Sequence, residues 1–465
     1  MTGQAIIAKL TNLESIEGAD KIVQCNIFGE TVIVSNTHQV GEIGVLFDCE
    51  TELSHEFCYQ NNLYRHSNLN KDKSKSGYIE DNRRVRPIRL KGVKCSGLWL
   101  PMESLVWAIS DVNDAPGIGE QFITLQGIEI CRKYVNKATK IAQGNKQGKA
   151  KENLVPTFKE HVDTDQFMRN QQVIQPGNTV IITEKLHGTS CRVGYLKTIE
   201  KNKLWTRICL SFISLFRDFK WKWKTAKHSL RYNHVVGSRR VVKQIGETET
   251  EKENSYYKED IWSLTAEQFR GKLEKGETVY YEIVGYLPGG GSIMGSHSNS
   301  KLKKFMDKDE YKEFLKKYGD TTEFHYGCTG SDGNVYKIFV YRITLTNEEG
   351  HTVDYSWDQV KMRCEQLGVK HVPELERTIA QLWENSENDD CFVGDHWGNK
   401  FEDIISNHAE NDSESFPDHI IEGVCVRVES GSLIPKFLKH KAYLFKVLEG
   451  IIKDNDAVDM EESQG

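Results

Sequence analysis

A lysine ends an apolar, β-branched run near the middle of the chain and is followed by a turn-like segment. The run closes at Lys185, and "LHGTS" follows, in which Gly188 allows the backbone to turn or to approach a ligand closely. A lysine acts as a nucleophile only as a free amine, whereas its unperturbed pKa is about 10.4. Lys185 is therefore either an ordinary solvated side chain or a nucleophile whose neighbours favour the neutral form.

Four further charged side chains lie in segments that otherwise read as apolar strands. Glu282 in "VYYEIVGY" and Glu422 in "EGVCVRV" interrupt such runs, and a half-buried carboxylate requires a partner or a ligand. Lys439 and Lys441 in "LKHKAYLFK" are two residues apart, which places them on one face of a strand. Two adjacent ammonium groups repel unless an anion lies between them. Such a pair would lower the pKa of Lys185 and would neutralise a bound phosphate.

Length and composition limit the class of protein. At 465 residues the chain predicts two or three domains, and it has no apolar run long enough to cross a bilayer. Eleven cysteines, an odd number without a CxxC pair, indicate reduced thiols and a cytoplasmic or nuclear location. The start "MTGQAIIAKLT" lacks the features of a secretory signal. HExxH, Walker-type and GxGxxG motifs are absent, so those routes to metal, ATP or dinucleotide chemistry are unsupported.

The charge is mildly acidic overall but unevenly distributed. Thirteen lysines and arginines lie between positions 197 and 243, where only two acidic residues occur. Within this stretch, "KLWTRICLSFISLFRDFKWKWK" has apolar residues four apart, as in a short helix packed on the domain. The alternative is a basic aromatic arm that binds RNA through Lys220, Lys222 and Lys224. A helix lying on a membrane surface is the weakest interpretation, since nothing else indicates lipid.

Residue patterns predict an α+β protein with two main regions. Residues 1–130 read as short strands with glycine turns, which is typical of a small β-barrel such as an OB fold, or of another small β-domain. Residues 131–165 are polar and predict a linker, and residues 166–450 predict a longer mixed domain. Its predicted helices are 266–273, 307–318, 357–367 and 374–384. The acidic tail, 451–465, is predicted to be disordered.

Taken in order, the motifs resemble the covalent nucleotidyltransferase superfamily, which holds ATP-dependent DNA and RNA ligases and mRNA capping enzymes. In chain order they are Lys185-Leu186-His187-Gly188, Ser238-Arg239-Arg240, Tyr281-Glu282-Ile283-Val284-Gly285, Val340-Tyr341-Arg342-Ile343, Glu422-Gly423-Val424 and Lys439-His440-Lys441. The KxHG form and the earlier segment "RVRPIRLKGVKCSGLWLP" are similar to the RNA ligase branch that carries an N-terminal OB domain. The resemblance implies a mixed α/β nucleotidyltransferase domain with ATP-grasp-like antiparallel sheets. No C-terminal OB domain is recognisable after Lys446, which favours an RNA ligase over the other relatives.

The resemblance implies a role for each motif residue. Lys185 would be the nucleophile, and Lys439 and Lys441 would be catalytic lysines at the α-phosphate. The other implied contacts are Glu184 to the base edge, Glu282 to the ribose hydroxyls, Arg239 to the ribose or a phosphate, Tyr341 stacked on adenine, Glu422 as a metal ligand or orienting carboxylate, and Ser190 in RNA sealing. Arg342 stands where the branch often has aspartate, and Arg240 where asparagine is common, which leaves the family roles at those positions open.

The function implied by the resemblance is ATP-dependent RNA ligation. The enzyme would join 3′-OH and 5′-phosphate ends, nicked duplex RNA in particular, in RNA repair, with ATP and Mg²⁺ or Mn²⁺ as cofactors. Three alternatives remain open: a capping guanylyltransferase that uses GTP, a protein that adenylylates other targets, and a non-catalytic OB-type RNA-binding protein. No membrane association and no obligate protein partner are inferred.

Overall fold

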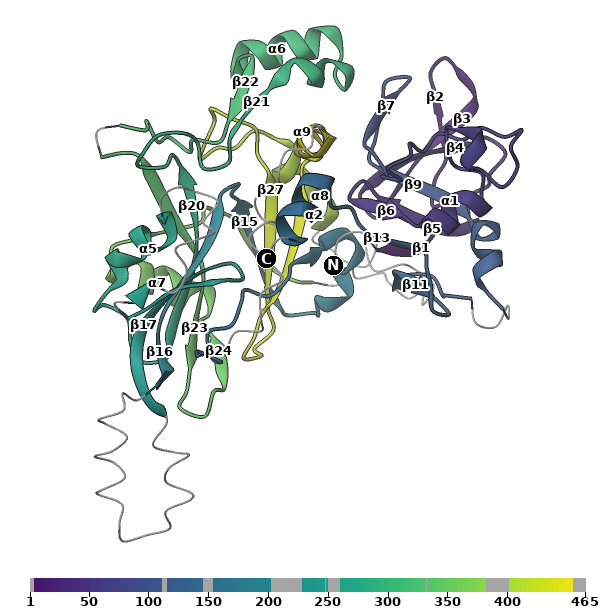
Figure 1. The fold of residues 1–465 in the computed structure, drawn as a ribbon. Helices are drawn as coiled ribbons and strands as arrows, with labels where there is room; N and C mark the ends of the chain where they lie inside the picture. The colour runs from purple at the N-terminus through teal and green to yellow at the C-terminus, as the bar shows by residue number, and fades with distance from the viewer. Residues whose placement is uncertain are drawn as a thin grey trace.

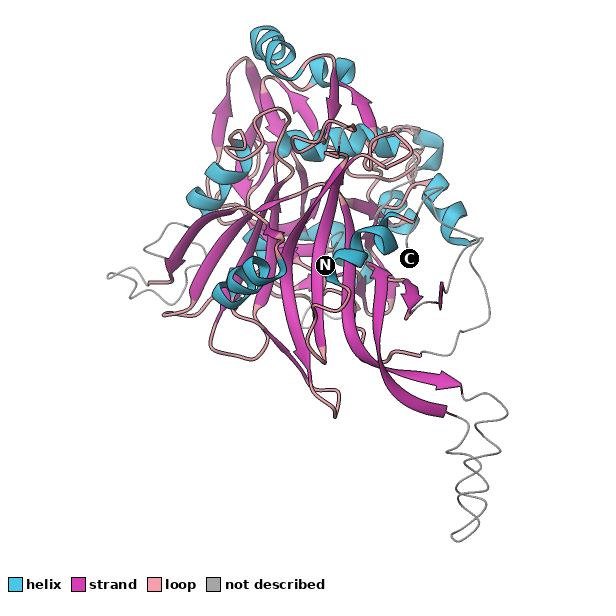
Figure 2. Ribbon diagram, turned by 90° about the vertical axis from the view of Figure 1, so that its left-hand side faces the viewer, coloured by secondary structure: helices cyan, strands magenta, loops and turns pink. Residues whose placement is uncertain are grey.

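The computed structural model describes residues 4–110, 115–144, 154–201, 228–246, 248–249, 260–331, 333–381 and 401–454. It is an α+β protein in which sheets form most of the framework and short helices lie around them (Figures 1 and 2). The N-terminal strands gather on one side of the molecule, and two larger sheets built from later residues lie on the other (Figure 1). The mixed class predicted from the sequence is confirmed.

The N-terminal region is built on a four-stranded antiparallel sheet. Its strands, in spatial order, are β10 (Gln121–Phe122), β1 (Ala5–Lys9), β5 (Ile43–Asp48) and β9 (Gly97–Pro101). Side chains alternate between two apolar cores, so that Val45 and Phe47 pack on one face and Leu46 on the other. Both faces of this sheet are therefore covered.

Smaller sheets complete the N-terminal region. They are β2 (Glu14–Ile16), β3 (Ala19–Ile27) and β4 (Glu30–Ser35); β6 (Thr51–Leu53) with β13 (Cys131–Lys133); β7 (Ile88–Leu90) with β8 (Val93–Cys95); and β11 (Thr124–Leu125) with β12 (Ile128–Glu129). The helices are α1 (His55–Gln60) and the 3₁₀ segments η1 (Ser67–Leu69) and η2 (Met102–Ala108). Among the described residues these pairings do not close into a barrel. The OB-like barrel therefore stays a prediction.

The stretch predicted as a linker contains ordered elements. Strand β13 and helix α2 (Lys137–Gly144) fall within 131–165, and β14 (Asp165–Gln166) begins at its end. Strand β13 pairs with β6, which ties the start of this stretch to the N-terminal region. The 3₁₀ segments η4 (Phe167–Arg169) and η5 (Gln171–Val173) follow.

Two sheets form the larger region. One has five strands in the order β14, β28 (Lys436–Lys441), β27 (Gly423–Glu429), β15 (Thr179–Lys185) and β26 (Glu374–Ile379). The other has eight: β19 (Thr248–Glu249), β18 (Val242–Ile245), β17 (His228–Ser238), β16 (Thr189–Lys201), β20 (Glu277–Gly285), β23 (Tyr336–Thr346), β24 (Thr352–Asp354) and, pairing with β23, β25 (Lys370–His371). Strands β21 (Ser296–Ser298) and β22 (Thr321–Glu323) form a separate pair.

The alternation of side chains along β15 assigns its two faces. Val180 and Ile182 pack in a core with helix α8 (Phe401–Glu410), whereas Ile181 joins the core that includes the eight-stranded sheet. Residues at odd positions, which include Lys185, therefore face the eight-stranded sheet. The remaining helices are α5 (Ile261–Ala266), η6 (Glu267–Phe269), η7 (Asn299–Lys304), α6 (Lys308–Tyr318), α7 (Trp357–Leu367) and α9 (Tyr443–Asp454).

Two of the four predicted helices are found where the sequence placed them. Helix α6 covers 308–318, and α7 begins after a capping box in which Ser356 and Gln359 satisfy each other's backbone donors. The helix predicted at 266–273 begins earlier because Asp260 caps α5, and it stops before Gly271, which has φ +74.

The helix predicted at 374–384 is wrong. Residues Glu374–Ile379 form strand β26, which pairs antiparallel with β15, so the sheet edge overrides the helix propensity of glutamate, leucine and arginine. At the C-terminal side, α9 continues to Asp454 and passes the predicted domain end at 450.

Candidate active site

The register of three strands brings the predicted catalytic lysines together. Across β15, β27 and β28, Lys185 lies opposite Gly423, which lies opposite Lys441. Two pairs further along, Cys425 on β27 lies opposite Lys439. Because side chains two apart share a face, Lys439 and Lys441 face the same side of the sheet as Lys185.

Lys185 forms an ion pair with Glu422. Its Nζ lies 2.6 Å from Glu422 Oε1, and the two side chains are 16% and 3% exposed. Burial would raise the pKa of Glu422, but Lys185, His187 and Lys441 together outweigh burial, and the pKa lies below its ordinary value. The nucleophile candidate is thus held by a carboxylate that stays ionised.

Glycines allow the backbone to pass close to its neighbours on both sides of this pair. A Cβ on Gly188 would lie 2.4 Å from the carbonyl oxygen of Ile283 on β20, which no side chain tolerates. Gly423 has φ +144, and a Cβ there would lie 2.1 Å from the carbonyl oxygen of His440. Between them, the backbone N–H of His187 donates to Tyr326 Oη at 2.6 Å, which fixes the turn after Lys185.

The eight-stranded sheet supplies the opposite wall. Ser190 on β16 lies directly across from Glu282 on β20. The β20–β23 register shifts by one residue: Tyr280 faces Arg342 and Tyr281 faces Val340, so Tyr341 is the extra residue of a bulge. Bulges commonly re-aim side chains next to functional sites. Here Tyr341 Oη and Ser190 Oγ share a hydrogen bond of 2.8 Å.

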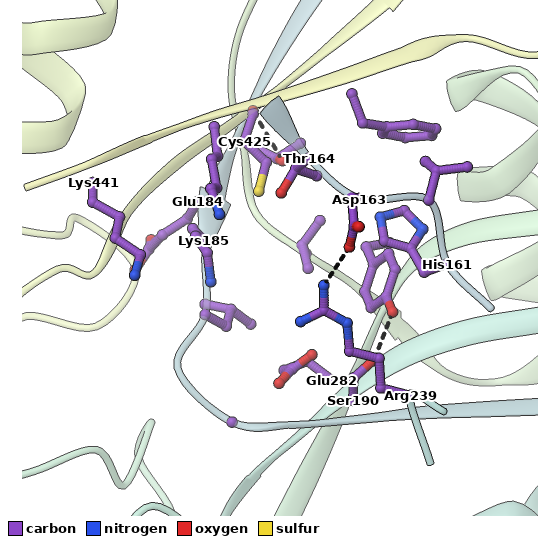
Figure 3. Close-up of a pocket in the computed structure, with 18 of the residues that line it drawn as sticks. His161, Asp163, Thr164, Glu184, Lys185, Ser190, Arg239, Glu282, Cys425 and Lys441 are labelled. Carbon is purple, nitrogen blue, oxygen red and sulfur yellow. Dashed lines mark hydrogen bonds and ion pairs between the residues drawn. The ribbon is translucent and has the colours of Figure 1, made fainter. Parts of the chain in front are cut away.

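A cavity of ≈ 350 Å³ lies between these walls (Figure 3). The predicted site residues that line it are Glu184, Lys185, Ser190, Arg239, Glu282, Tyr341, Lys439 and Lys441. Figure 3 shows Lys185 and Lys441 on one side and Arg239, Glu282 and Ser190 on another. Residues of five of the six motifs line this cavity, and the sixth motif adjoins it through the contact of Glu422 with Lys185.

The two C-terminal lysines have different charge environments. Lys441 Nζ donates to Glu50 Oε1 at 2.7 Å and to Glu449 Oε2 at 2.8 Å. Burial lowers the pKa of Lys441, but these carboxylates outweigh burial and raise it well above its ordinary value. Burial lowers the pKa of Lys439, and the cations Lys441 and Lys185 lower it further. Lys441 is therefore a fixed cation, whereas the charge on Lys439 is destabilised.

Glu184 has its carboxylate on the opposite face of β15. Ser413 Oγ donates to Glu184 Oε2 at 2.8 Å, and burial raises the pKa of Glu184 to about 7. A contact from this side chain to a base edge would have to compete with Ser413. The role of Glu184 at the base therefore stays a prediction.

A short segment before the catalytic region reaches the cavity, and its residues were not among the predicted site residues. His161, Asp163 and Thr164 line the cavity, although the stretch reads as a polar linker. Asp163 Oδ1 lies 2.9 Å from Arg239 Nη2, and the His161 ring meets the Tyr341 ring edge to face with centroids 5.0 Å apart. In the sequence, the stretch "DTDQF", which contains Asp163 and Thr164, is similar to the RNA ligase branch and indicates a functional role for these residues.

His161 is a neutral imidazole within a group of arginines. Burial and the cations Arg342, Arg239 and Arg427 hold its pKa well below the ordinary value. Arg342 Nη1 lies 3.4 Å from His161 Nδ1. Because a guanidinium only donates, Nδ1 must accept and the proton must lie on Nε2.

The departure at Arg342 has a structural explanation. Arg342 makes a two-pronged ion pair with Asp354 on β24, with Nε–Oδ1 at 2.6 Å and Nη2–Oδ2 at 2.8 Å. Both side chains are buried, so the arginine has a local partner across the strands. The predicted RNA-binding residues Lys220, Lys222 and Lys224 lie outside the described residues.

The donor set fits a magnesium or manganese ion that is shared with a substrate. Within the described ranges, no cluster of three or more His, Cys, Asp or Glu side chains could hold a metal by itself. The second oxygen of Glu422, Oε2, is buried and makes no hydrogen bond to any described residue, although His187 Nδ1 lies 3.4 Å from it. Hard divalent cations are commonly held by one or two carboxylates together with substrate phosphates. Glu422 is the residue here that fits this use.

Comparisons with known proteins identify the family. A family model described as RNA ligase matches residues 178–448, which is more than half of the chain. The chain belongs to the RNA ligase family. No curated protein matches the chain.

Solved structures of Naegleria gruberi RNA ligase share the fold. An apo mutant matches with a TM-score of 0.53 and 16% identity over 96% of this chain and 98% of that chain. The form with PPi matches with a TM-score of 0.51 and 15% identity, covering 98% and 99%. A mutant with ATP and Mn matches with a TM-score of 0.51 and 14% identity, covering 95% and 98%. The likeness extends over nearly the whole of both chains.

The helices in the described part of the chain are all too short or too polar to cross a membrane.

Proposed function

We propose that the chain is an ATP-dependent RNA ligase that joins 3′-OH and 5′-phosphate RNA ends through a covalent lysyl-AMP. The observation that carries the proposal is the position of Lys185, whose Nζ contacts Glu422 at 2.6 Å at the wall of a cavity that Lys439 and Lys441 also line. Phosphoryl transfer depends mainly on positioning and on stabilising charge, and this arrangement supplies both.

Three steps follow from this arrangement. The Lys185 amine attacks the α-phosphorus of ATP, the bond to the β-phosphate oxygen breaks, and pyrophosphate leaves while Nζ loses a proton. The 5′-phosphate of RNA then attacks the adenylate, and the phosphorus–nitrogen bond breaks to give RNA-adenylate. Finally the 3′-OH attacks the activated 5′-phosphate, loses its proton and releases AMP. Lys185 must leave its contact with Glu422 before the first step, because that carboxylate favours the ammonium form.

The other motif residues have proposed roles at the nucleotide. Lys441, a fixed cation, neutralises the α-phosphate together with Lys439. Glu282 binds the ribose hydroxyls, Arg239 binds the ribose or a phosphate, and Tyr341 stacks on adenine. Ser190 acts in sealing, and its hydrogen bond to Tyr341 supports a link between the sealing residue and the base-stacking residue.

ATP and Mg²⁺ or Mn²⁺ are the proposed cofactors. The Naegleria gruberi enzyme has been solved with ATP and Mn, with AMP and Mn, and with PPi. In this chain Glu422 would hold the ion, which when bound stabilises the charge of the phosphates.

The proposed partner is RNA, with nicked duplexes as the preferred substrate and RNA repair as the role. An OB-like N-terminal domain and the basic stretch between 197 and 243 would hold the strand near the break. A cytoplasmic or nuclear location is supported by the cysteines of the described ranges, which are free thiols.

The test is nucleotide labelling followed by sealing. Wild type, Lys185→Ala and the surface control Lys312→Ala, whose side chain is 66% exposed on α6, are incubated separately with α-labelled ATP and GTP, then run on a denaturing gel. Label from ATP on wild type and the control, but not on Lys185→Ala, is expected, and nicked RNA should then be sealed. Label from GTP alone would indicate a capping enzyme instead. Label without sealing would indicate adenylylation of other targets, and RNA binding without any label would indicate a non-catalytic protein.

A further inference from the structure

Glu50 is a residue of the N-terminal region that reaches the cavity. It lies in the turn between β5 and β6 and lines the cavity beside the catalytic lysines. Its Oε1 accepts from Lys441 Nζ at 2.7 Å, and both side chains are only 9% exposed. Lys441 thus contacts two carboxylates. One is Glu449 of its own region, and the other is Glu50, which is almost four hundred positions away in sequence.

The backbone that carries Glu50 is fixed by several contacts. The N–H of Glu50 donates to Asp48 Oδ1 at 3.0 Å, and its carbonyl accepts from the Tyr134 N–H at 2.8 Å. Asp48 Oδ2 in turn lies 3.5 Å from Arg169 Nη2 of the larger region. Glu50 therefore contacts Lys441 from a backbone that is itself held in place, as a positioning residue requires.

A second buried ion pair between the same regions provides a comparison. Glu30 on β4 accepts from Lys446 on α9 at 2.6 Å, and both side chains are 7% exposed. It resembles the Glu50–Lys441 pair in length, burial and the regions that it joins, but it does not line the cavity. The two pairs are equivalent as structural links and differ in their relation to the site.

Charge at the cavity gives Glu50 a specific task. Lys439 and Lys441 lie on one strand face with Lys185 nearby, and three cations there repel one another. A carboxylate at Lys441 reduces this repulsion and fixes the direction of the ammonium group, so fewer orientations remain to be lost when a phosphate arrives.

We propose that Glu50 is a positioning residue of the ligase site, which holds Lys441 so that the N-terminal region takes part in forming the lysyl-AMP. The inference rests on the proposed function. It assigns to the N-terminal region a part in the first chemical step, which precedes any contact with RNA. Glu50 acts through Lys441 and does not itself contact the reacting atoms.

The experiment compares Glu50→Gln with Glu30→Gln in the full chain. Lysyl-AMP formation is measured in single turnover with α-labelled ATP over a range of ATP concentrations, beside thermal unfolding of each variant. Glu50→Gln is expected to lower the maximal rate about 10-fold or more, with a smaller change in the ATP concentration at half-maximal rate. Glu30→Gln is expected to lower the unfolding temperature while the rate stays within about two-fold.

Glu50→Asp provides a second variant if Glu50→Gln does not fold. It keeps the charge at the interface, shortens the side chain by one methylene, and is expected to give a rate between wild type and Glu50→Gln. Equal rate losses for Glu50→Gln and Glu30→Gln, or a wild-type maximal rate in Glu50→Asp and Glu50→Gln, would overturn the inference. If wild type takes no label at all, the proposed function itself has failed; if wild type labels and the Glu50 variants label equally fast, only the role of Glu50 has failed.

Discussion

Lys185 Nζ and Glu422 Oε1 lie 2.6 Å apart, on residues that end one strand and precede the next strand of the same sheet. The pairing is set by backbone hydrogen bonds, since Lys185 faces Gly423 across β15 and β27. The Glu422 carboxylate holds Lys185, the proposed nucleophile, at the cavity wall. The position of the Lys185 side chain therefore depends on the Glu422 carboxylate as well as on strand β15.

Removal of the Glu422 charge should disable the first step. Glu422→Gln is expected to slow lysyl-AMP formation at least about 100-fold, a change of about 3 kcal/mol, because it removes the charged carboxylate that places Lys185 at the cavity wall and that would hold the metal ion. Gel labelling with α-labelled ATP measures the rate. Glu376→Gln on the neighbouring strand β26 is the matched control and should label as wild type. Wild-type labelling by Glu422→Gln would show that the pair is not needed for adenylylation.

The hydrogen bond between Ser190 and Tyr341 should couple their effects. Tyr341→Phe keeps the ring and removes the hydroxyl, and Ser190→Ala removes the other partner. Each is expected to slow sealing of nicked RNA about 5-fold, corresponding to about 1 kcal/mol for one hydrogen bond. The double variant should be no slower than either single variant, as in a coupled pair. Strictly multiplicative losses would mean that the two hydroxyls act independently.

Arg239 and Asp163 should differ in importance although they form an ion pair. Asp163 is 70% exposed and Arg239 26%, so the pair itself contributes little. Asp163→Asn is expected to leave lysyl-AMP formation within about three-fold of wild type. Arg239→Ala should raise the ATP concentration at half-maximal rate about 10-fold through loss of a charged contact. A large defect in Asp163→Asn alone would instead make Asp163 the residue that orients Arg239.

Glu184 should make stability fall as the pH rises from about 4.5 to about 7. The folded-state pKa of Glu184 is raised by burial to about 7, against an ordinary value of 4.5, so the folded protein keeps a proton that the unfolded chain releases in this window. Glu184→Gln cannot ionise and should be more stable than wild type above pH 7, by about 2–3 kcal/mol. Denaturant unfolding at pH 4 and pH 8 measures the difference.

The stabilising effect of Glu184→Gln should disappear near pH 4, because the Glu184 carboxyl of the wild type is protonated there in both the folded and the unfolded state. Glu313→Gln on the exposed face of α6 is the control and should change stability little at either pH. A destabilised Glu184→Gln at pH 8 would indicate that the ionised carboxylate is needed by the fold.

Local sequence patterns predicted what depends on neighbours in sequence. Alternation placed Lys439 and Lys441 on one strand face, and the helix predicted at 357–367 coincides with α7. The same period of two could have added Cys425 and Arg427, which also line the cavity from β27. The order of the motifs predicted which residues would meet.

Contacts between distant segments could not be predicted in this way. Glu50 reads as a polar residue in a turn, and its contact with Lys441 depends on how two regions pack. The strand at Glu374–Ile379 reads as a helix because its pairing with β15 is not encoded locally. Arg342 departs from the aspartate that is common at this position in the branch, and its partner, Asp354, lies on the next strand.

The strand order also bears on when the enzyme can become active during its synthesis. The five-stranded sheet places β27 and β28, which are translated late, between β14 and β15, which are translated early. Until residue 441 has left the ribosome, Lys185 on β15 lacks both β27, which follows Glu422, and β28, which carries Lys439 and Lys441. A nascent or prematurely terminated chain therefore carries Lys185 without the neighbours that its proposed reaction with ATP requires.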